Sequence, residues 1–102
     1  MEIKQHPVLN EEIAGQLAEL FRSLSDPNRI RLISVMARGE INVGSLVQEV
    51  GISESSVSHH LRGLRQMRLV RARKDGRQVF YRLDDEHIAD LYQRGLDHIL
   101  HG

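Results

Sequence analysis

Four side chains near the end of the sequence are of types that bind transition metals: Asp85, His87, His98 and His101. One carboxylate and three imidazoles make a donor set that suits tetrahedral Zn(II), and Co(II) or Ni(II) can use the same ligands. The sequence contains no cysteine, which excludes thiolate metal sites, disulfides and a catalytic thiol. These residues therefore predict a metal site built from histidine and carboxylate alone.

The spacing of these four residues places them on one helix. Apolar side chains recur at helical intervals over about residues 85–101, after an acidic first turn that complements the helix dipole. At 100° per residue, His98 lies within about 20° of His87 on this helix, and His101 lies within about 40°. His98 and His101, three residues apart, share one face and can chelate the same ion.

One helix cannot surround an ion with both of its ends, because roughly 16 Å of helix axis separates His87 from His98. Two antiparallel helices can do so. The Asp85/His87 end of one chain then meets the His98/His101 end of its partner, and two-fold symmetry gives two equal sites. The sequence therefore predicts a homodimer through its terminal helices. Surface histidines, or a dimer interface without metal, remain the alternative.

Positive charge is concentrated in one stretch of a chain whose formal net charge is zero. Residues 62–82 carry eight basic side chains against one acid, whereas the segments on either side are both net acidic. Such a basic segment indicates contact with nucleic acid, although a solvated face is the ordinary alternative. The basic residues are Arg62, Arg65, Arg68, Arg71, Arg73, Lys74, Arg77 and Arg82.

The elements that position this segment follow from periodicity and turn residues. The sequence predicts helices over about 9–24, from Pro27 to near Gly39, over 43–50 and over 54–66, with Asp26 and Ser53 as N-caps. The last two of these, separated by a turn at Gly51, form a helix-turn-helix. We expect the core to be aliphatic: Leu9, Leu17, Leu20, Ile30, Leu32, Ile33, Leu46, Val50, Leu61 and Leu64.

Two strand-like runs follow the helix-turn-helix, residues 69–74 and 78–83, and they are joined around Asp75-Gly76, a strong hairpin signal. The basic segment covers the end of the second helix and this hairpin, which favours DNA binding over a solvated face. The predicted fold is mainly α with a small β-hairpin, a winged helix-turn-helix. We expect a single domain over 1–102, with the helix-turn-helix at about 43–66, the wing at about 69–83 and the terminal helix at about 85–101.

Other function classes fit the sequence less well. No apolar run approaches the ~18 residues of a membrane helix, and the first residues do not resemble a signal peptide, so we expect a cytoplasmic protein without membrane contact. A zinc hydrolase or metal buffer is the rival from another class. A catalytic zinc needs an open coordination position, whereas four protein ligands would close this one, so we expect no enzyme.

The chain resembles the arsenic-repressor (ArsR/SmtB) family of winged-helix metal sensors. The resemblance runs from about Leu17 to His101 and rests on residues 24–31 (LSDPNRIR), residues 55–61 (SSVSHHL) and the last helix. That helix matches the D-x-H-x10-H-x-x-H pattern of the family's last-helix zinc sensors through Asp85, His87, His98 and His101.

The resemblance implies which residues contact DNA. Residues 54–66 are similar to the family's recognition helix, which enters the major groove, with Val57, His60 and Leu61 turned toward the core or flank. Glu54 departs from the family, where glutamine is common, and we assign it no DNA contact. The implied contacts are Ser55, Ser56, Ser58 and His59 on the helix, Arg62 and Arg65 to phosphates, and Lys74 and Arg77 at the wing.

The resemblance also implies a function. The metal-free dimer would bind double-stranded operator DNA, and Zn(II), or Co(II) or Ni(II), would weaken that binding and derepress metal efflux or sequestration genes. Some relatives add N-terminal ligands for nickel or cobalt, a role open to His6, for which no role is the simpler interpretation. A winged-helix repressor with a structural metal or none, and a winged helix used for protein contacts, are the remaining alternatives.

Overall fold

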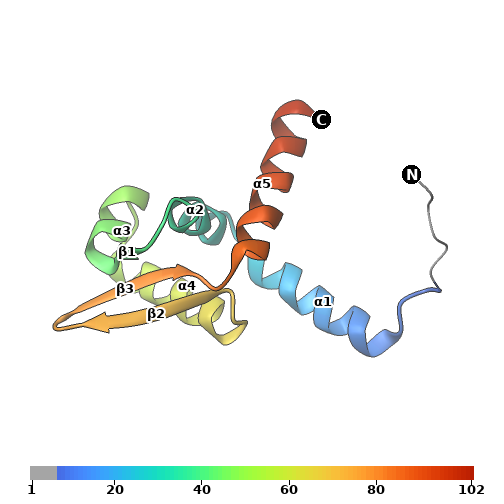
Figure 1. The fold of residues 1–102 in the computed structure, drawn as a ribbon, viewed down its shortest axis with the longest axis horizontal. Coiled ribbons are helices and arrows are strands. Elements are labelled where there is room, and N and C mark those ends of the chain that lie inside the picture. The colour runs from blue at the N-terminus through green and yellow to red at the C-terminus, as the bar shows by residue number, and fades with distance from the viewer. Residues whose placement is uncertain (1–6) are drawn as a thin grey trace.

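The computed structural model describes residues 7–102, and Figure 1 shows their arrangement. A short three-stranded antiparallel sheet, in the order β1-β3-β2, lies beside a group of helices, while the first and last helices extend away from it (Figure 1). The elements are α1 (Glu11–Leu24), α2 (Pro27–Met36), β1 (Ile41–Asn42), α3 (Val43–Val50), α4 (Glu54–Gln66), β2 (Val70–Asp75), β3 (Gln78–Leu83) and α5 (Glu86–His101).

Polar side chains fix where the helices begin. The Asp26 carboxylate accepts the backbone N–H groups of Asn28 and Arg29, and Pro27 occupies the first position of α2, as the sequence predicts. Ser53 caps α4 in the same way by accepting the N–H of Ser56. Each cap satisfies donors that the first turn of a helix leaves without partners. The α2 helix ends at Met36, three residues before the predicted glycine.

The core lies between α2, α3, α4 and the sheet. The α4 helix contributes Val57, Leu61 and Leu64, all at most 1% exposed. The remaining buried apolar residues come from neighbouring elements: Leu32, Ile33, Val35, Met36, Leu46, Val50, Leu69, Val70 and Leu83. The sequence prediction of an aliphatic core is confirmed for these elements.

That prediction is wrong for part of the chain. Leu9 and Leu17 of the N-terminal segment are 50% and 41% exposed, and Ile30 of α2 is also exposed. No residue of α1 or of α5 is buried. Helical periodicity identifies an apolar face, but it does not say whether the partner of that face lies in the same chain.

The α3 and α4 helices each end near a residue in the left-handed conformation. Gly51, at φ 76°, ends α3 and opens the turn to α4. At the end of α4, Arg68 takes φ 58°, and the N–H of Leu69 bonds to the carbonyl of Leu64 at 2.9 Å. This Schellman-type ending places Leu69 in the core and directs the chain into β2, although an arginine replaces the usual glycine.

The wing differs in two details from its prediction. Its strands pair from Val70↔Leu83 to Asp75↔Gln78, so the loop consists of Gly76 and Arg77 rather than Asp75 and Gly76. A third strand, β1, pairs with β3, and its two residues are too few to produce a periodic pattern. The mainly α winged helix-turn-helix is confirmed. Among the described residues, no helix is long and apolar enough to cross a membrane.

Candidate nucleic-acid interface and metal-ligand groups

The α4 helix has its apolar side chains on one face and its polar side chains on the other. Its apolar residues point into the core, and Ser55, Ser58 and His59 are exposed, while Ser56 is half-buried. Arg62 and Arg65 continue the exposed face toward the end of the helix. The helix is held by its buried side, so the polar side remains available to a groove of DNA.

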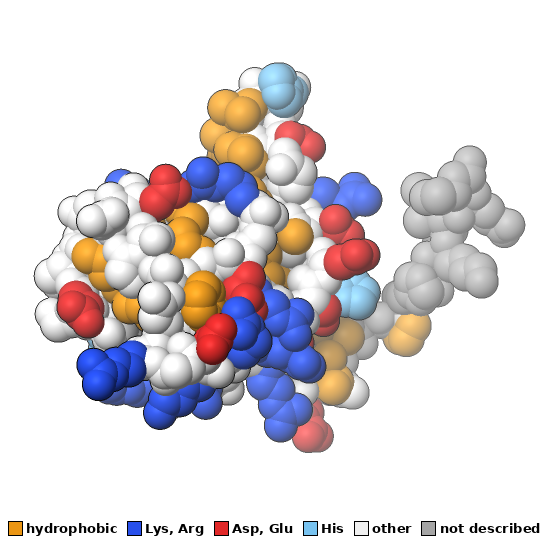
Figure 2. Space-filling view, turned by 60° about the vertical axis from the view of Figure 1, so that its left-hand side comes forward, with side chains coloured by type: hydrophobic (Ala, Val, Ile, Leu, Met, Phe, Trp, Pro, Cys, Tyr) orange, Lys and Arg blue, Asp and Glu red, His pale blue; other side chains and the backbone are white. Residues whose placement is uncertain are grey.

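The basic segment divides into paired and unpaired side chains. Arg71 forms an ion pair with Asp84. Arg73 donates three hydrogen bonds to Glu40, the shortest one 2.6 Å from Nη2 to Oε1. The Glu40 hydrogen bond raises the pKa of Arg73 above its usual value. Figure 2 shows basic side chains gathered over the lower part of the molecule.

The four cations that the resemblance assigns to DNA make no ion pair within residues 7–102. They are Arg62, Arg65, Lys74 and Arg77. The charge pattern of the sequence does not separate the paired basic residues from the unpaired ones. Glu40 and Arg73 are 33 positions apart, so no local signal identifies their pairing.

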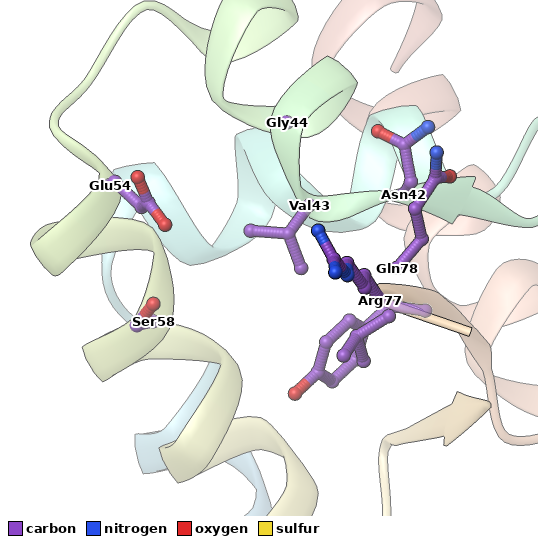
Figure 3. A pocket seen from close by; sticks show the side chains of 9 residues that line it. Asn42, Val43, Gly44, Glu54, Ser58, Arg77 and Gln78 are labelled. Atoms are coloured by element: carbon purple, nitrogen blue, oxygen red, sulfur yellow. The ribbon is translucent and has the colours of Figure 1, made fainter. Parts of the chain in front are cut away.

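A hollow of about 510 Å³ lies between α4, the start of α3 and the wing. Glu54 and Ser58 line it from α4, and Arg77 of the wing loop and Gln78 of β3 line it from the wing (Figure 3). The hollow joins the helix that suits the major groove to the loop that suits the neighbouring backbone or minor groove. Glu54 brings a carboxylate to this surface, and it has no hydrogen bond or ion pair in the part of the chain that the structure describes.

Two of the proposed metal ligands already lie together at the start of α5. Asp85 is the N-cap, and its Oδ1 accepts the His87 N–H at 2.8 Å and lies 3.3 Å from His87 Nδ1. Burial alone raises the pKa of Asp85, but hydrogen bonds from His87 hold it below its usual value. The His87 side chain is 91% exposed, so its ring is open to a further partner.

The other two proposed ligands, His98 and His101, lie in the last turn of α5 and are both exposed. In the described range 7–102, no three histidine, aspartate or glutamate side chains of one chain cluster closely enough to hold an ion. His6 lies outside the described residues. The structure thus brings together Asp85 and His87 but leaves the two pairs at opposite ends of the helix.

Both terminal helices present apolar side chains to solvent. In Figure 1, α5 projects from the body of the molecule, and in Figure 2 the same projection carries an apolar strip with a histidine at its tip. Ile99 of α5 is 80% exposed and Phe21 of α1 is 50% exposed. Exposed apolar surface of this kind marks a contact with another molecule.

Comparison with known proteins gives consistent results. The family model described as bacterial regulatory protein, arsR family, matches residues 26–72. A transcriptional repressor SmtB homolog of Synechocystis is 46% identical over 95 residues, covering 93% of this chain and 72% of that protein. A cadmium resistance regulatory protein CadC homolog of Staphylococcus aureus is 33% identical, covering 93% and 74%. The crystal structure of the AntR antimony-specific transcriptional repressor superposes with a TM-score of 0.86 at 30% identity, covering 95% and 88%.

Proposed function

Because this chain belongs to the arsR family of bacterial regulatory proteins, we propose that it represses transcription as a metal-free homodimer on operator DNA. We further propose that Zn(II), bound by its terminal helices, releases that DNA and derepresses metal efflux or sequestration genes. The similar proteins are named as repressors or resistance regulators, which supports a regulator rather than an enzyme.

DNA contact is supported by the exposed polar face of α4 and by the unpaired cations beside it. In this proposal, Ser55, Ser58 and His59 meet base edges, with the half-buried Ser56 at the margin of that contact. Phosphates would be bound by Arg62, Arg65, Lys74 and Arg77, which give up no ion pair within the described residues to do so. Two such surfaces in a dimer match a pseudo-palindromic operator.

Dimerisation is supported by the exposed apolar faces of α1 and α5. Phe21 and Leu17 of α1, with Ile99 and Leu100 of α5, leave apolar surface that a single chain does not cover. A second copy is the occupant that the metal ligands require, because the pair at the start of α5 needs the pair at the end of another. The interface is then isologous, with the same surface contributed by both chains.

The residues present fit Zn(II). Asp85, His87, His98 and His101 offer one oxygen and three nitrogens, and Asp85 uses Oδ1 for both of its contacts with His87. Similar proteins carry names that refer to cadmium and antimony, so family membership does not select the metal. The donor set favours Zn(II), since the chain has no thiolate to offer, and Co(II) and Ni(II) accept the same ligands.

Bound zinc would supply positive charge and a link between two chains. Added charge alone would strengthen binding to DNA, so release of the operator must come from a change in shape. In our proposal, ligands shared between the α5 helices fix the two chains in one relative position. The two α4 helices then no longer match successive major grooves.

The observation that carries the proposal is the division of ligands in α5, with Asp85 against His87 at one end and His98 with His101 at the other. The test selects a tight-binding duplex from random DNA with the metal-free protein, then titrates the complex with zinc, cobalt and nickel. We expect zinc to weaken wild-type binding by at least about fivefold. His98→Ala should abolish this response, whereas Asp97→Asn, a control on the same helix, should keep it.

Three outcomes would count against parts of the proposal. Equal affinities with and without zinc would remove the metal switch and leave a repressor with a structural metal or none. Zinc binding by a protein that selects no DNA would indicate a metal buffer. The cobalt complex should absorb strongly in the visible range, as a tetrahedral site does, and a weak octahedral spectrum would implicate His6 or water as additional ligands.

A further inference from the structure

Arg29 of α2 joins three helices through one guanidinium group. Its Nε donates to Nδ1 of His60 on α4 at 3.1 Å, and its Nη1 donates to the carbonyl of Ser23 in the last turn of α1 at 3.2 Å. Arg29 is half-buried, and the His60 side chain is only 13% exposed. We call this set of contacts the Arg29 bridge. It links the end of α1 to the middle of α4.

Gly63 allows the guanidinium to lie directly on α4. A Cβ atom at this position would come within 2.5 Å of Arg29 Nη2 and 2.8 Å of its Cζ. A glycine inside a helix weakens that helix relative to alanine. The close approach of Arg29 gives a physical reason for a glycine here, one helical turn after His60.

The bridge also determines which ring nitrogen of neutral His60 carries the hydrogen. Because Nδ1 accepts from Arg29, neutral His60 carries its hydrogen on Nε2. That nitrogen lies 3.9 Å from Oδ1 of Asp26, the cap of α2. Burial raises the pKa of Asp26, but the N–H donors of Arg29 and Asn28 and the nearby His60 lower it by a larger amount. The pKa of Asp26 therefore lies below its usual value. A charged Asp26 therefore faces the bridge at neutral pH.

The bridge contacts α4 beside its DNA-facing residues. The rings of His59 and His60 lie 5.4 Å apart, with His59 exposed and His60 turned inward. On the α1 side, the bridge meets the helix that packs Leu20 and Leu24 against the core but leaves Leu17 and Phe21 exposed. The orientation of α4 is thereby tied to that of α1 by a directional polar contact, in addition to non-directional apolar packing.

We propose that Arg29 is a positioning residue that sets the orientation of α4 relative to α1, and hence the placement of both α4 helices on DNA. This rests on the proposed function, because α1 must form the dimer interface and α4 must enter the groove. Loss of an ordinary stabilising hydrogen bond would lower DNA affinity only to the extent that it lowered stability. The two roles differ in one measurable respect, whether DNA binding falls when stability does not.

Gly63→Ala separates the two roles. The methyl group displaces the guanidinium, whereas the helix itself gains from alanine, so we expect the melting temperature to be unchanged or up to about 4 °C higher. Operator affinity should nevertheless fall at least about tenfold, the loss of roughly one good base contact. Gly15→Ala is the matched control, since it lies in α1 with open space around it and faces away from the apolar side. It should raise stability without changing affinity.

Variants of His60 test the bond itself. His60→Asn places an amide oxygen where Nδ1 accepts, so it should bind DNA within about threefold of wild type, whereas His60→Leu should lose about tenfold. Nitrogen NMR of the wild type should show His60 protonated on Nε2, and Arg29→Lys should remove the hydrogen bond at Nδ1. Equal DNA affinity in Gly63→Ala, His60→Leu and wild type would overturn the proposal.

Failure of the bridge and failure of the proposed function are distinguishable. Residual dipolar couplings report the angle between α1 and α4 without any DNA. A changed angle in Gly63→Ala and an unchanged one in Gly15→Ala would support the bridge even if the wild type selected no duplex. An unchanged angle in both variants, with a wild type that binds DNA, would overturn the bridge alone.

Discussion

The α4 helix and the two terminal helices use similar amphipathic patterns in opposite ways. The apolar residues of α4 are fully buried within the chain, whereas neither α1 nor α5 has a buried residue. The fully buried core therefore lies within the segment from α2 to β3, and the terminal helices add only partly buried residues to it. Pattern alone does not distinguish an internal core from an interface between chains.

The difference matches the two tasks that we propose. A helix that enters a groove must keep a fixed orientation, and α4 is held by its core residues, its Ser53 cap and the Arg29 bridge. Helices that depend on a second copy can change the relative placement of two chains. A metal can shift such an equilibrium only if it binds one arrangement more tightly, as ligands split between two chains allow.

Phe21→Asp on α1 should have the largest effect of these substitutions, because it tests whether the exposed apolar face of α1 forms the dimer interface. Phe21 is 50% exposed in the single chain, and the proposed dimer would bury its ring. A carboxylate there should raise the dimer dissociation constant at least about 100-fold, because each of the two chains loses an aromatic contact. The fold from α2 to β3 should persist. Sedimentation together with circular dichroism measures both properties. A dimer of unchanged affinity would show that α1 is not the interface.

Leu61→Ala on α4 should have the converse effect. Removing a side chain that is 1% exposed leaves a cavity, so the free energy of unfolding should fall by about 2–5 kcal/mol. Urea denaturation at several protein concentrations separates this loss from weaker dimerisation. The matched variant Leu17→Ala on α1 should instead lower stability mainly at low protein concentration, and the same loss at every concentration would contradict the proposed interface.

Two arginines of the wing should differ in their contribution to DNA binding. Arg77 forms no ion pair among the described residues. Arg77→Gln should therefore make the slope of the logarithm of DNA affinity against the logarithm of salt concentration shallower by about two per dimer. Arg71 is already paired with Asp84, so Arg71→Gln should change the slope far less. Equal changes in fluorescence anisotropy titrations over a salt series would remove the distinction.

Glu54→Gln should have the smallest effect, an increase in DNA affinity of about two- to fivefold at low salt. Its carboxylate lines the hollow opposite Arg77 and repels phosphates, and this repulsion is screened as salt rises (Figure 3). Glu11→Gln removes a carboxylate from the first turn of α1 and serves as the control. Weaker binding by Glu54→Gln at every salt concentration would instead show that the carboxylate contacts a base.

Much of the fold could be predicted because its signals are local. Asp26 and Ser53 cap the helices as predicted, and α3 and α4 have the predicted limits. Local signals failed where a feature depended on few residues or on distant ones. The two residues of β1 are strands only because β3 lies beside them, and the wing loop begins one residue later than Asp75-Gly76 suggests.

The candidate site was predicted unevenly for the same reason. Periodicity puts His87, His98 and His101 on one helical face, and it needs no tertiary information because the helix is regular over its length. The choice of metal and the contacts with DNA remain predictions. Which arginines keep their charge available was not predictable, since Glu40 and Arg73 meet only through the folded chain.

The sequence by itself determined the helices, the wing and the division of metal-ligand types between the two ends of α5, because each depends on spacing within one element. Tertiary structure decided which apolar faces are buried, which cations are paired and where Arg29 holds α4. Those features depend on distances between residues far apart in the chain. Such distances are set only when the elements pack together.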